Sequence, residues 1–430
     1  MKKIWLLLVL ALFGCQSLTK ITASKPEVDL LQNPEQQATT ILDSRDLQTN
    51  KFSEKKVRVA VFVPTSGKNK ELGLSLFNAA TLSLFDNDKN HNIELVLIDS
   101  KDTPEEAQKA FQEVIKSDIK VVIGPVFSTS VEAIEKDAKR NDIAVISFSN
   151  NQKLSNKIND DGGIFIAGML PEAQVDKIVS YAMSRGKFTF SIIAPSNQYG
   201  KAMSDIFKQI VRDRDGKFVT SEFYNTNGRD LDKVVTNAIN AFVIPDRLTE
   251  GRNKKLKKDT IISESDRTYS QVIMIPESGK ALSKIVASIN KQNTEERNFQ
   301  IVGTSNWDDV STFNDRNLFG AWFAAPEGEK FREFEKRFYQ TYDKFPPRIT
   351  SISYDAVKAI AKLVELKQEQ VPTVEDFVNY RNLATNGFEG IDGVFRFLPN
   401  GLVQRNLAVL QVANGRFDVI EKPNEKFLKY

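Results

Sequence analysis

The sequence predicts an α/β protein built from two doubly wound lobes. Short runs rich in valine and isoleucine alternate with amphipathic stretches from Val57 onwards. Near-continuous apolar runs of this length are typical of parallel strands buried on both faces, and the intervening stretches suit crossover helices. The chain from Val57 to Tyr430 is longer than one typical core requires, so we expect two successive sheets.

The candidate strands are short apolar runs bounded by polar or turn residues. They are Val57–Pro64, Ile93–Asp99, Val121–Pro125, Ile143–Phe148, Phe188–Pro195, Phe218–Tyr224, Gln271–Pro276 and Phe299–Thr304. The amphipathic stretches that separate most of these runs predict the repeated strand-helix order of a doubly wound sheet.

Two helix starts carry capping signatures. Thr103 is a capping residue followed by Pro104 at the first helical position, and Glu106 stands three residues after the cap. Thr129 and Glu132 form a second box of this kind, which predicts the start of the helix that follows Gly124-Pro125.

Two segments break the regular order. Residues 245–268 are polar and rich in lysine, and we interpret them as a solvated surface loop or flap, with a partner-binding element as the alternative. The stretch Gly393–Glu421 alternates between strand and turn patterns, with turns at Pro399–Gly401 and Asn414-Gly415. It predicts an antiparallel ribbon added to one lobe.

The N-terminus has the organisation of a secretory signal. Two lysines follow Met1, Ile4–Phe13 is apolar, and Gly14 precedes Cys15. Ten apolar residues are too few to span a bilayer, which needs about 20. Leu12–Cys15 resembles the lipobox of bacterial lipoproteins, which implies that residues 1–14 are removed and that Cys15 carries the lipid.

The rest of the chain agrees with export. Cys15 is the single cysteine of the sequence, so the exported body would carry no thiol into an oxidising compartment. Residues 15–56 are polar without a sustained apolar period, and we interpret them as a lipid-anchored flexible tether. Gln16 after the cysteine resembles the sorting signal for the outer membrane, which implies a lipoprotein that faces the periplasm.

The composition argues against several classes of function. Removal of residues 1–14 deletes Lys2 and Lys3 and no acid, so the formal charge falls from +3 to +1, and a nucleic-acid partner is not expected. His91 is the single histidine, which excludes a multi-histidine metal site, and no Walker or GxGxxG motif follows a strand. We therefore expect a non-enzymatic protein without metal or cofactor.

A series of short segments, in matching order and spacing, resembles the type I periplasmic binding-protein fold. The resemblance is to its leucine/isoleucine/valine-binding branch and covers about residues 57–421. The segments are Ser66-Gly67, Gly73, Asn78–Ala80, Val122–Pro125, Ser128–Ser130, Val145–Ser147, Gln198–Gly200, Gly390–Phe397 and Asn400-Gly401. Within the branch, Phe388–Phe397 and Arg405–Leu410 are most similar to penicillin-binding-protein activators.

The resemblance implies two Rossmann-like lobes joined by hinge strands, with a ligand held between them. One lobe would comprise residues 57–170 plus 326–394 and the other residues 171–325 plus 395–421. Residues 422–430 would form a C-terminal tail.

Candidate ligand-binding residues follow from the strand ends and from the resemblance. Ser128, Thr129 and Ser130 stand after a strand and at a helix start, where backbone N–H groups favour an anion, although plain capping is the alternative. Ser147 and Ser149, at the end of the next strand, would face the same cleft by analogy with the family.

The sequence departs from the amino-acid-binding pattern at two places. Leu72 stands where these receptors often carry an aromatic residue, and Gly303–Trp307 offers no acid for a ligand ammonium, although Asp308 and Asp309 follow. Tyr199 and Glu277 could partly substitute.

Two functions remain open at this point. One is a regulatory lipoprotein that stimulates peptidoglycan synthesis by contacting a penicillin-binding synthase, which the C-terminal similarity and the departures favour. The other is the receptor of an ABC importer that passes branched-chain or related amino acids to a permease, which the serine cluster favours.

The lipobox generates a direct prediction. Cells fed a fatty-acid analogue should label the wild-type protein and leave the Cys15→Ala variant unlabelled, because Cys15 provides the only thiol to which lipid can attach. The two bands are compared on one gel, and equal labelling would contradict the lipoprotein hypothesis.

Overall fold

A computed structural model of the chain describes residues 56–154, 163–242, 271–292, 299–380 and 383–427. The predicted signal peptide, Cys15, nearly all of the predicted tether and the 245–268 segment lie outside these described residues. Within them, no helix is long and apolar enough to span a membrane.

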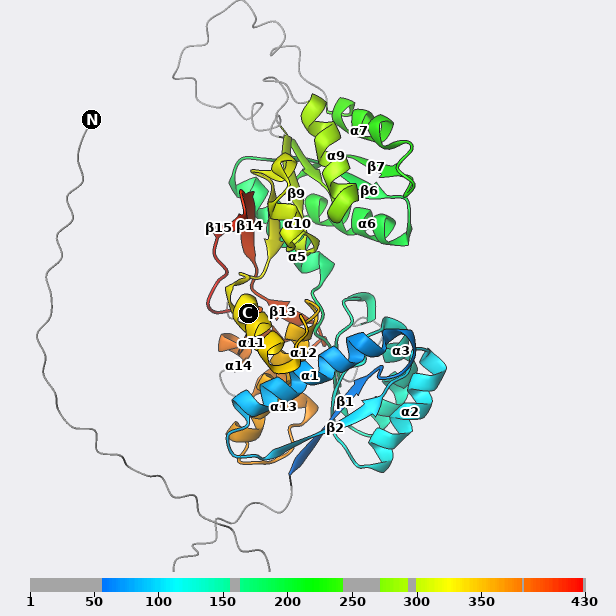
Figure 1. The fold of residues 1–430 in the computed structure, drawn as a ribbon, viewed down its shortest axis with the longest axis vertical. Coiled ribbons are helices and arrows are strands. Elements are labelled where there is room, and N and C mark those ends of the chain that lie inside the picture. Colours follow the sequence, from blue (N-terminus) through cyan, green and yellow to red (C-terminus); the bar gives the residue numbers. More distant parts are fainter. Residues whose placement is uncertain (1–55, 155–162, 243–270, 293–298, 381–382, 428–430) are drawn as a thin grey trace, which may run out of the picture. The chain divides into compact units, whose positions relative to one another are not determined.

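The first sheet has five parallel strands in the order β2-β1-β3-β4-β5 (Figure 1). Its strands are β1 (Val57–Val63), β2 (Ile93–Asp99), β3 (Val121–Ile123), β4 (Ala144–Ser147) and β5 (Ile164–Ile166). Its helices are α1 (Lys70–Asn87), α2 (Pro104–Lys116), α3 (Ser128–Arg140) and α12 (Thr350–Leu366). The strands β3, β4 and β5 are buried along their whole length, because helices cover the sheet.

The second sheet has seven strands in the order β15-β14-β10-β9-β8-β6-β7. The parallel strands are β6 (Thr189–Pro195), β7 (Lys217–Tyr224), β8 (Gln271–Met274), β9 (Phe299–Gly303) and β10 (Trp322–Ala325), and the antiparallel pair is β14 (Ala408–Ala413) and β15 (Arg416–Glu421). Ile192 and Ala194 pack with α5 (Pro171–Ser184) and α6 (Gln198–Asp213), whereas Ile193 between them packs with α7 (Leu231–Asn240) and α9 (Gly279–Gln292). Alternate side chains therefore bury opposite faces of the sheet.

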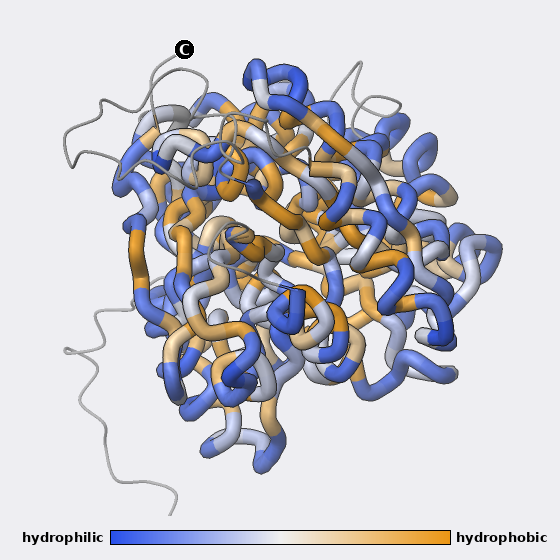
Figure 2. Tube along the Cα trace, turned by 90° about the horizontal axis from the view of Figure 1, so that it is seen from above, coloured by the Kyte–Doolittle hydropathy of each residue, from blue (hydrophilic) through white to orange (hydrophobic). Residues whose placement is uncertain are grey.

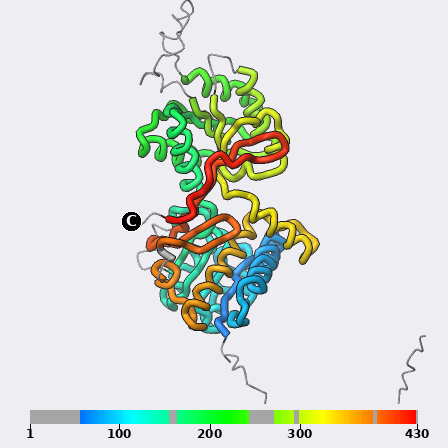
Figure 3. Tube along the Cα trace, turned by 90° about the vertical axis from the view of Figure 1, so that its left-hand side faces the viewer, coloured from blue at the N-terminus to red at the C-terminus, as the bar shows by residue number. Residues whose placement is uncertain are grey.

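A third, three-stranded sheet joins β11 (Phe388–Gly390), β12 (Gly393–Phe397) and β13 (Val403–Arg405) in antiparallel order. Phe388, Phe395 and Phe397 belong to the same core as the first sheet. Figure 3 shows this orange segment beside the blue and cyan elements, and the red β14–β15 hairpin beside the yellow ones. The remaining helices are η1 (Gly67–Asn69), η4 (Ser305–Trp307), α10 (Val310–Phe313), η5 (Arg316–Leu318), α11 (Glu329–Tyr342), α13 (Val374–Asn379) and α14 (Leu383–Asn386).

The C-terminal ribbon expected over Gly393–Glu421 is two hairpins that belong to different sheets. Both predicted turns are present, but the chain leaves the third sheet after Arg405 and enters the second sheet at Ala408. The lobe boundary expected between residues 394 and 395 falls inside β12, because Phe395 and Phe397 are needed in the first core.

The apolar periodicity predicted the strands well. Every candidate strand is present within two residues of its expected ends, and Figure 2 shows the hydrophobic segments gathered inside a hydrophilic rim.

Thr103 caps α2 as predicted and accepts a hydrogen bond from the N–H of Glu106 at 3.3 Å. The predicted cap at Thr129 is wrong: α3 begins at Ser128, and the extended residue Phe127 occupies the N-cap position.

Two glycines let a helix start close to the end of its strand. A Cβ atom on Gly73 in α1 would lie 1.7 Å from the carbonyl oxygen of Pro64, and one on Gly200 in α6 would lie 1.9 Å from that of Pro195. Backbone cannot yield as a flexible side chain does, so both positions require glycine.

We therefore expect Gly73→Ala and Gly200→Ala each to lower the free energy of unfolding by roughly 1–3 kcal/mol or more, measured by urea denaturation, because overpacking moves the backbone. Gly328→Ala is the matched control, since its Cβ would meet only the end of the Arg332 side chain, at 3.1 Å. Equal losses in all three variants would argue against the close approach as the cause.

Candidate functional site

A cavity of about 380 Å³ lies at the carboxyl ends of strands from both large sheets. Open α/β sheets generally bind ligands in this position. The lining residues come from segments after β3, β4, β5, β9 and β10, from the start of α12, and from the turn between β11 and β12. They are Val126, Phe127, Ser128, Phe148, Ser149, Asn150, Met169, Ser305, Pro326, Arg348, Ile349, Ser351, Ile352 and Asp392.

Two of the predicted serines form one wall of this pocket. The hydroxyls of Ser128 and Ser149 are 2.9 Å apart and hydrogen-bonded. Ser128 is also the first residue of α3, whose first intrahelical bond at this end runs from the N–H of Val131 to the carbonyl of Phe127. The N–H groups before Val131 therefore have no acceptor within the helix, and together with the hydroxyls they form a site that favours an anion.

The other predicted hydroxyls near this wall do not line the pocket. Thr129 is exposed, and Ser130 lies on the buried face of α3. Ser147 is fully buried, donates to the carbonyl of Pro125 at 2.9 Å and accepts from the N–H of Ser149 at 3.1 Å. These contacts position the turn that carries Ser149.

Tyr199 and Glu277, the two second-lobe candidates, are also absent from the lining. The hydroxyl of Tyr199 accepts from the side-chain amide of Asn306 at 3.0 Å. Glu277 accepts a hydrogen bond from Tyr224 at 2.6 Å, and its carbonyl accepts one from the indole of Trp307 at 2.9 Å. Both residues support the segment after β9 that reaches the pocket at Ser305.

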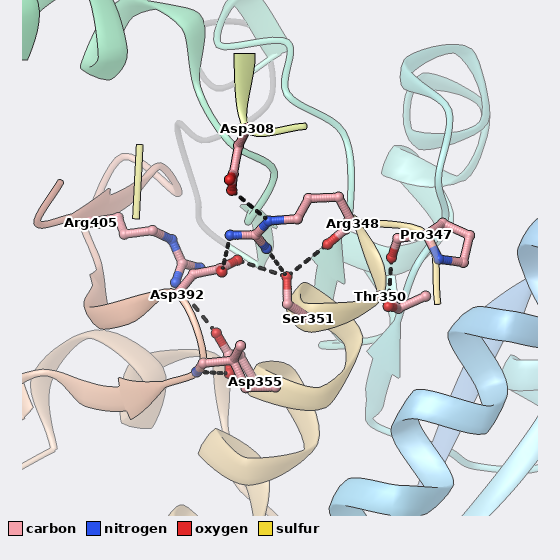
Figure 4. A network of polar contacts seen from close by, with 9 residues as sticks. Asp308, Pro347, Arg348, Thr350, Ser351, Asp355, Asp392 and Arg405 are labelled. Atoms are coloured by element: carbon pink, nitrogen blue, oxygen red, sulfur yellow. Dashed lines mark hydrogen bonds and ion pairs between the residues drawn. The ribbon is translucent and has the colours of Figure 1, made fainter. Parts of the chain in front are cut away.

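Sequence reasoning missed the charged wall of the pocket, which is centred on Arg348 (Figure 4). Its guanidinium forms an ion pair with Asp392 at 2.7 Å and a longer one with Asp308 at 3.4 Å, and it donates to the hydroxyl of Ser351 at 3.0 Å. The guanidinium carbon also lies 4.1 Å from the ring centroid of Phe331. These contacts on several sides hold the side chain in one orientation.

A second buried ion pair stands behind the first. Asp355 on α12 faces Arg405 of β13 at 3.4 Å and accepts the N–H of Ile391 at 2.6 Å. Gly390 makes room for it, because a Cβ there would lie 2.3 Å from the Asp355 carboxylate. Burial and the nearby Asp392 raise the pKa of Asp355 to about 6.

The other carboxylates of the network differ in their environment. Burial raises the pKa of Asp308 despite the opposing effect of Arg348. Burial also acts on Asp392, but the two arginines outweigh it and hold the pKa of this carboxyl below its ordinary value. Asp392 is therefore the ionised partner of Arg348.

The charge that a ligand meets in the pocket is positive. The side chain of Arg348 is 32% exposed, whereas that of Asp392 is 1% exposed. A carboxylate entering the pocket would thus find hydroxyls and helix N–H groups at one wall and a guanidinium at another. One sequence signal points to this wall: Asp392 lies in the segment that carried the activator resemblance, close to two glycines.

The structure offers no metal centre within the described residues, where no group of three or more His, Cys, Asp and Glu side chains is arranged to hold an ion. His91 is an exposed turn residue with a φ of 55°.

The chain is similar to known proteins both in sequence and in structure. A family model described as periplasmic binding protein matches residues 56–416. An uncharacterized protein of Rickettsia prowazekii is 24% identical over 283 residues, which cover 64% of this chain and 69% of that protein. A Rhodospirillum rubrum protein assigned to branched-chain amino acid ABC transport has a similar structure, with a TM-score of 0.68 and 17% identity, covering 85% of this chain and 100% of that one. The branched-chain amino acid binding protein of Streptococcus pneumoniae in complex with isoleucine has a TM-score of 0.52 and 17% identity, covering 86% and 100%.

The raised pKa of Asp355 makes stability depend on pH. The folded protein holds this proton more tightly than the unfolded chain, whose carboxyl titrates near 3.8, so the contribution of Asp355 to stability falls as pH rises from about 4 to about 6. Relative to Asp355→Asn, the wild type should therefore gain free energy of unfolding as pH is lowered through this window. Urea denaturation at several pH values measures the difference, and parallel profiles for the two proteins would contradict it.

Proposed function

The chain belongs to the periplasmic binding protein family, in its type I, branched-chain amino acid branch, and from this premise we propose that it is the substrate-binding receptor of an ABC importer. Its ligand is a small molecule with a carboxylate, held in the pocket where α3 begins. The observation that carries the proposal is the hydrogen bond between the hydroxyls of Ser128 and Ser149. Ser128 is the first residue of the 13-residue helix α3, and both serines line the 380 Å³ cavity.

The ligand chemistry follows from the donors. The helix N–H groups, the two hydroxyls and the guanidinium of Arg348 can all donate, and carboxylate oxygens are acceptors that suit each of them. The relative from Streptococcus pneumoniae was crystallised with isoleucine, which also carries a carboxylate. An ammonium group fits this pocket less well, because Asp392, the acid among the described lining residues, is 1% exposed and already paired with Arg348.

Transport is favoured over stimulation of a peptidoglycan synthase. The similarity to activators rests on the segment around Gly390, Asp392 and Arg405, and each of these residues has a structural role in the buried network. The named structural relatives are transport proteins. The hypothesis that the protein activates a penicillin-binding synthase therefore stays a prediction without support from these relatives.

The proposed location is the periplasm, with the body attached to a membrane through lipid on Cys15. A flexible tether of about 40 residues has a root-mean-square reach of roughly 35 Å. Sorting to the outer membrane, which Gln16 implies by resemblance, would separate the receptor from an inner-membrane permease, so membrane fractionation bears directly on the importer hypothesis.

Binding is tested by calorimetry and thermal unfolding on the refolded, ligand-free, detergent-solubilised full chain. The panel contains leucine, isoleucine, valerate, benzoate and glutarate. We expect at least one carboxylate to bind with a micromolar or tighter dissociation constant, and a ligand at 1,000 times that constant to stabilise the fold by about 4 kcal/mol. If none of these carboxylates binds, the receptor hypothesis is wrong.

Ser128→Ala should weaken binding by about one to two decades, because a hydrogen bond to a charged group contributes roughly 1.5–3 kcal/mol. The matched control is Thr129→Ala, which removes the neighbouring hydroxyl of the same helical turn but lies outside the pocket. An equal loss in both variants would show that the effect comes from the helix start and not from contact with the ligand.

A further inference from the structure

We propose that the natural ligand is a small dicarboxylate, whose second carboxylate binds Arg348. The inference rests on the receptor function proposed above and specifies the substrate class of the same pocket. Among the described residues that line this pocket, Arg348 is the cation.

The guanidinium has donors left for a ligand. Arginine carries five N–H groups, and the contacts to Asp308, Ser351 and Asp392 involve Nε, Nη1 and Nη2. One hydrogen on each terminal nitrogen remains beyond these contacts. Each of these hydrogens can donate to a carboxylate oxygen of a ligand.

The guanidinium is also held in place before a ligand arrives. One face lies over Phe331, with the guanidinium carbon 4.1 Å from the ring centroid, and the Asp392 ion pair orients the edge. A side chain that is already ordered loses little further conformational entropy on binding. The site is thus better suited to specificity than a free surface arginine.

The carboxylates around Arg348 expose less of their side chains than the guanidinium does. Asp392 lines the pocket, but its side chain is 1% exposed and is paired with Arg348, whereas Asp355 is buried outside the lining and is balanced by Arg405. Asp308 is the remaining carboxylate. Because burial raises its pKa, protonation of Asp308 requires less free energy than protonation of an ordinary aspartate. The exposed charge nearest a ligand is therefore the guanidinium.

Two anion-favouring walls in one pocket indicate a ligand with two anionic ends. Ser128 and Ser149 follow β3 and β4, whereas Arg348 precedes α12. The rest of the lining includes Phe127, Phe148, Met169, Pro326 and Ile349, which suit a short methylene chain. A branched-chain amino acid bound through its carboxylate at the serine wall would instead offer Arg348 no second carboxylate, and it would bring an ammonium group into a pocket whose exposed charge is positive.

The test compares dicarboxylates with monocarboxylates of the same chain length by calorimetry on the full chain. Succinate, glutarate and adipate are paired with butyrate, valerate and hexanoate. We expect the best dicarboxylate to bind about 10- to 100-fold tighter than its monocarboxylate partner. Equal affinity for the two members of every pair, or tighter binding of leucine than of any dicarboxylate, would overturn this inference and leave the receptor function standing. Failure of every carboxylate to bind would overturn both.

A pair of double variants assigns the discrimination to Arg348. Arg348→Gln alone would leave Asp392 buried without its ion-pair partner and could unfold the protein, so it is combined with Asp392→Asn. This variant should bind both members of the best pair within about threefold of each other. The matched control, Arg214→Gln with Asp176→Asn, removes an ion pair that lies outside the pocket and its network, and it should keep the discrimination. Near-UV circular dichroism verifies that each variant is folded. Discrimination retained without Arg348, or lost with the control pair, would overturn the proposal.

Discussion

The buried ion network between α12 and the third sheet is the constraint on which the pocket depends. Asp355 occupies the space that a Cβ on Gly390 would need, and Arg405 faces its carboxylate across the interface. Asp392, two residues after that glycine, pairs with Arg348. Burying charges is favourable only when they are paired and hydrogen-bonded, so the hairpin of β12 and β13 can dock in one register only. That register sets the orientation of the guanidinium that faces the ligand.

The two large sheets place the opposite wall of the pocket by ordinary packing. Parallel strands end at a common edge, and Gly73 and Gly200 allow α1 and α6 to begin almost in contact with that edge. The serine wall follows from the same geometry, because Ser128 starts the helix after β3 and Ser149 lies just after β4. The fold thus supplies the anion site at α3, whereas the charged network is specific to this sequence.

Sequence periodicity was enough for the sheets and for part of the site. Long valine-rich runs identified their strands because burial on both faces leaves little choice of residue. The short strands β3 and β4 were recognised by their valines, whereas the equally short β5 and β10, which contain none, were missed. Ser128 could be predicted from its position at a helix start, and Ser149 from the family resemblance. Arg348 could not, since its partners Asp308 and Asp392 lie 40 and 44 residues away and only the folded chain brings them together.

The network also changes what the C-terminal resemblance can mean. A motif is informative about a partner only when its residues are free to contact that partner. Asp392 is buried against Arg348, Arg405 against Asp355, and Gly390 is fixed by the Asp355 carboxylate. Any protein that docks this hairpin by the same ion pairs needs the same residues, whatever its partner or ligand. The shared segment therefore indicates a shared way of closing the first lobe, and the difference in function has to lie in the side chains that face the pocket.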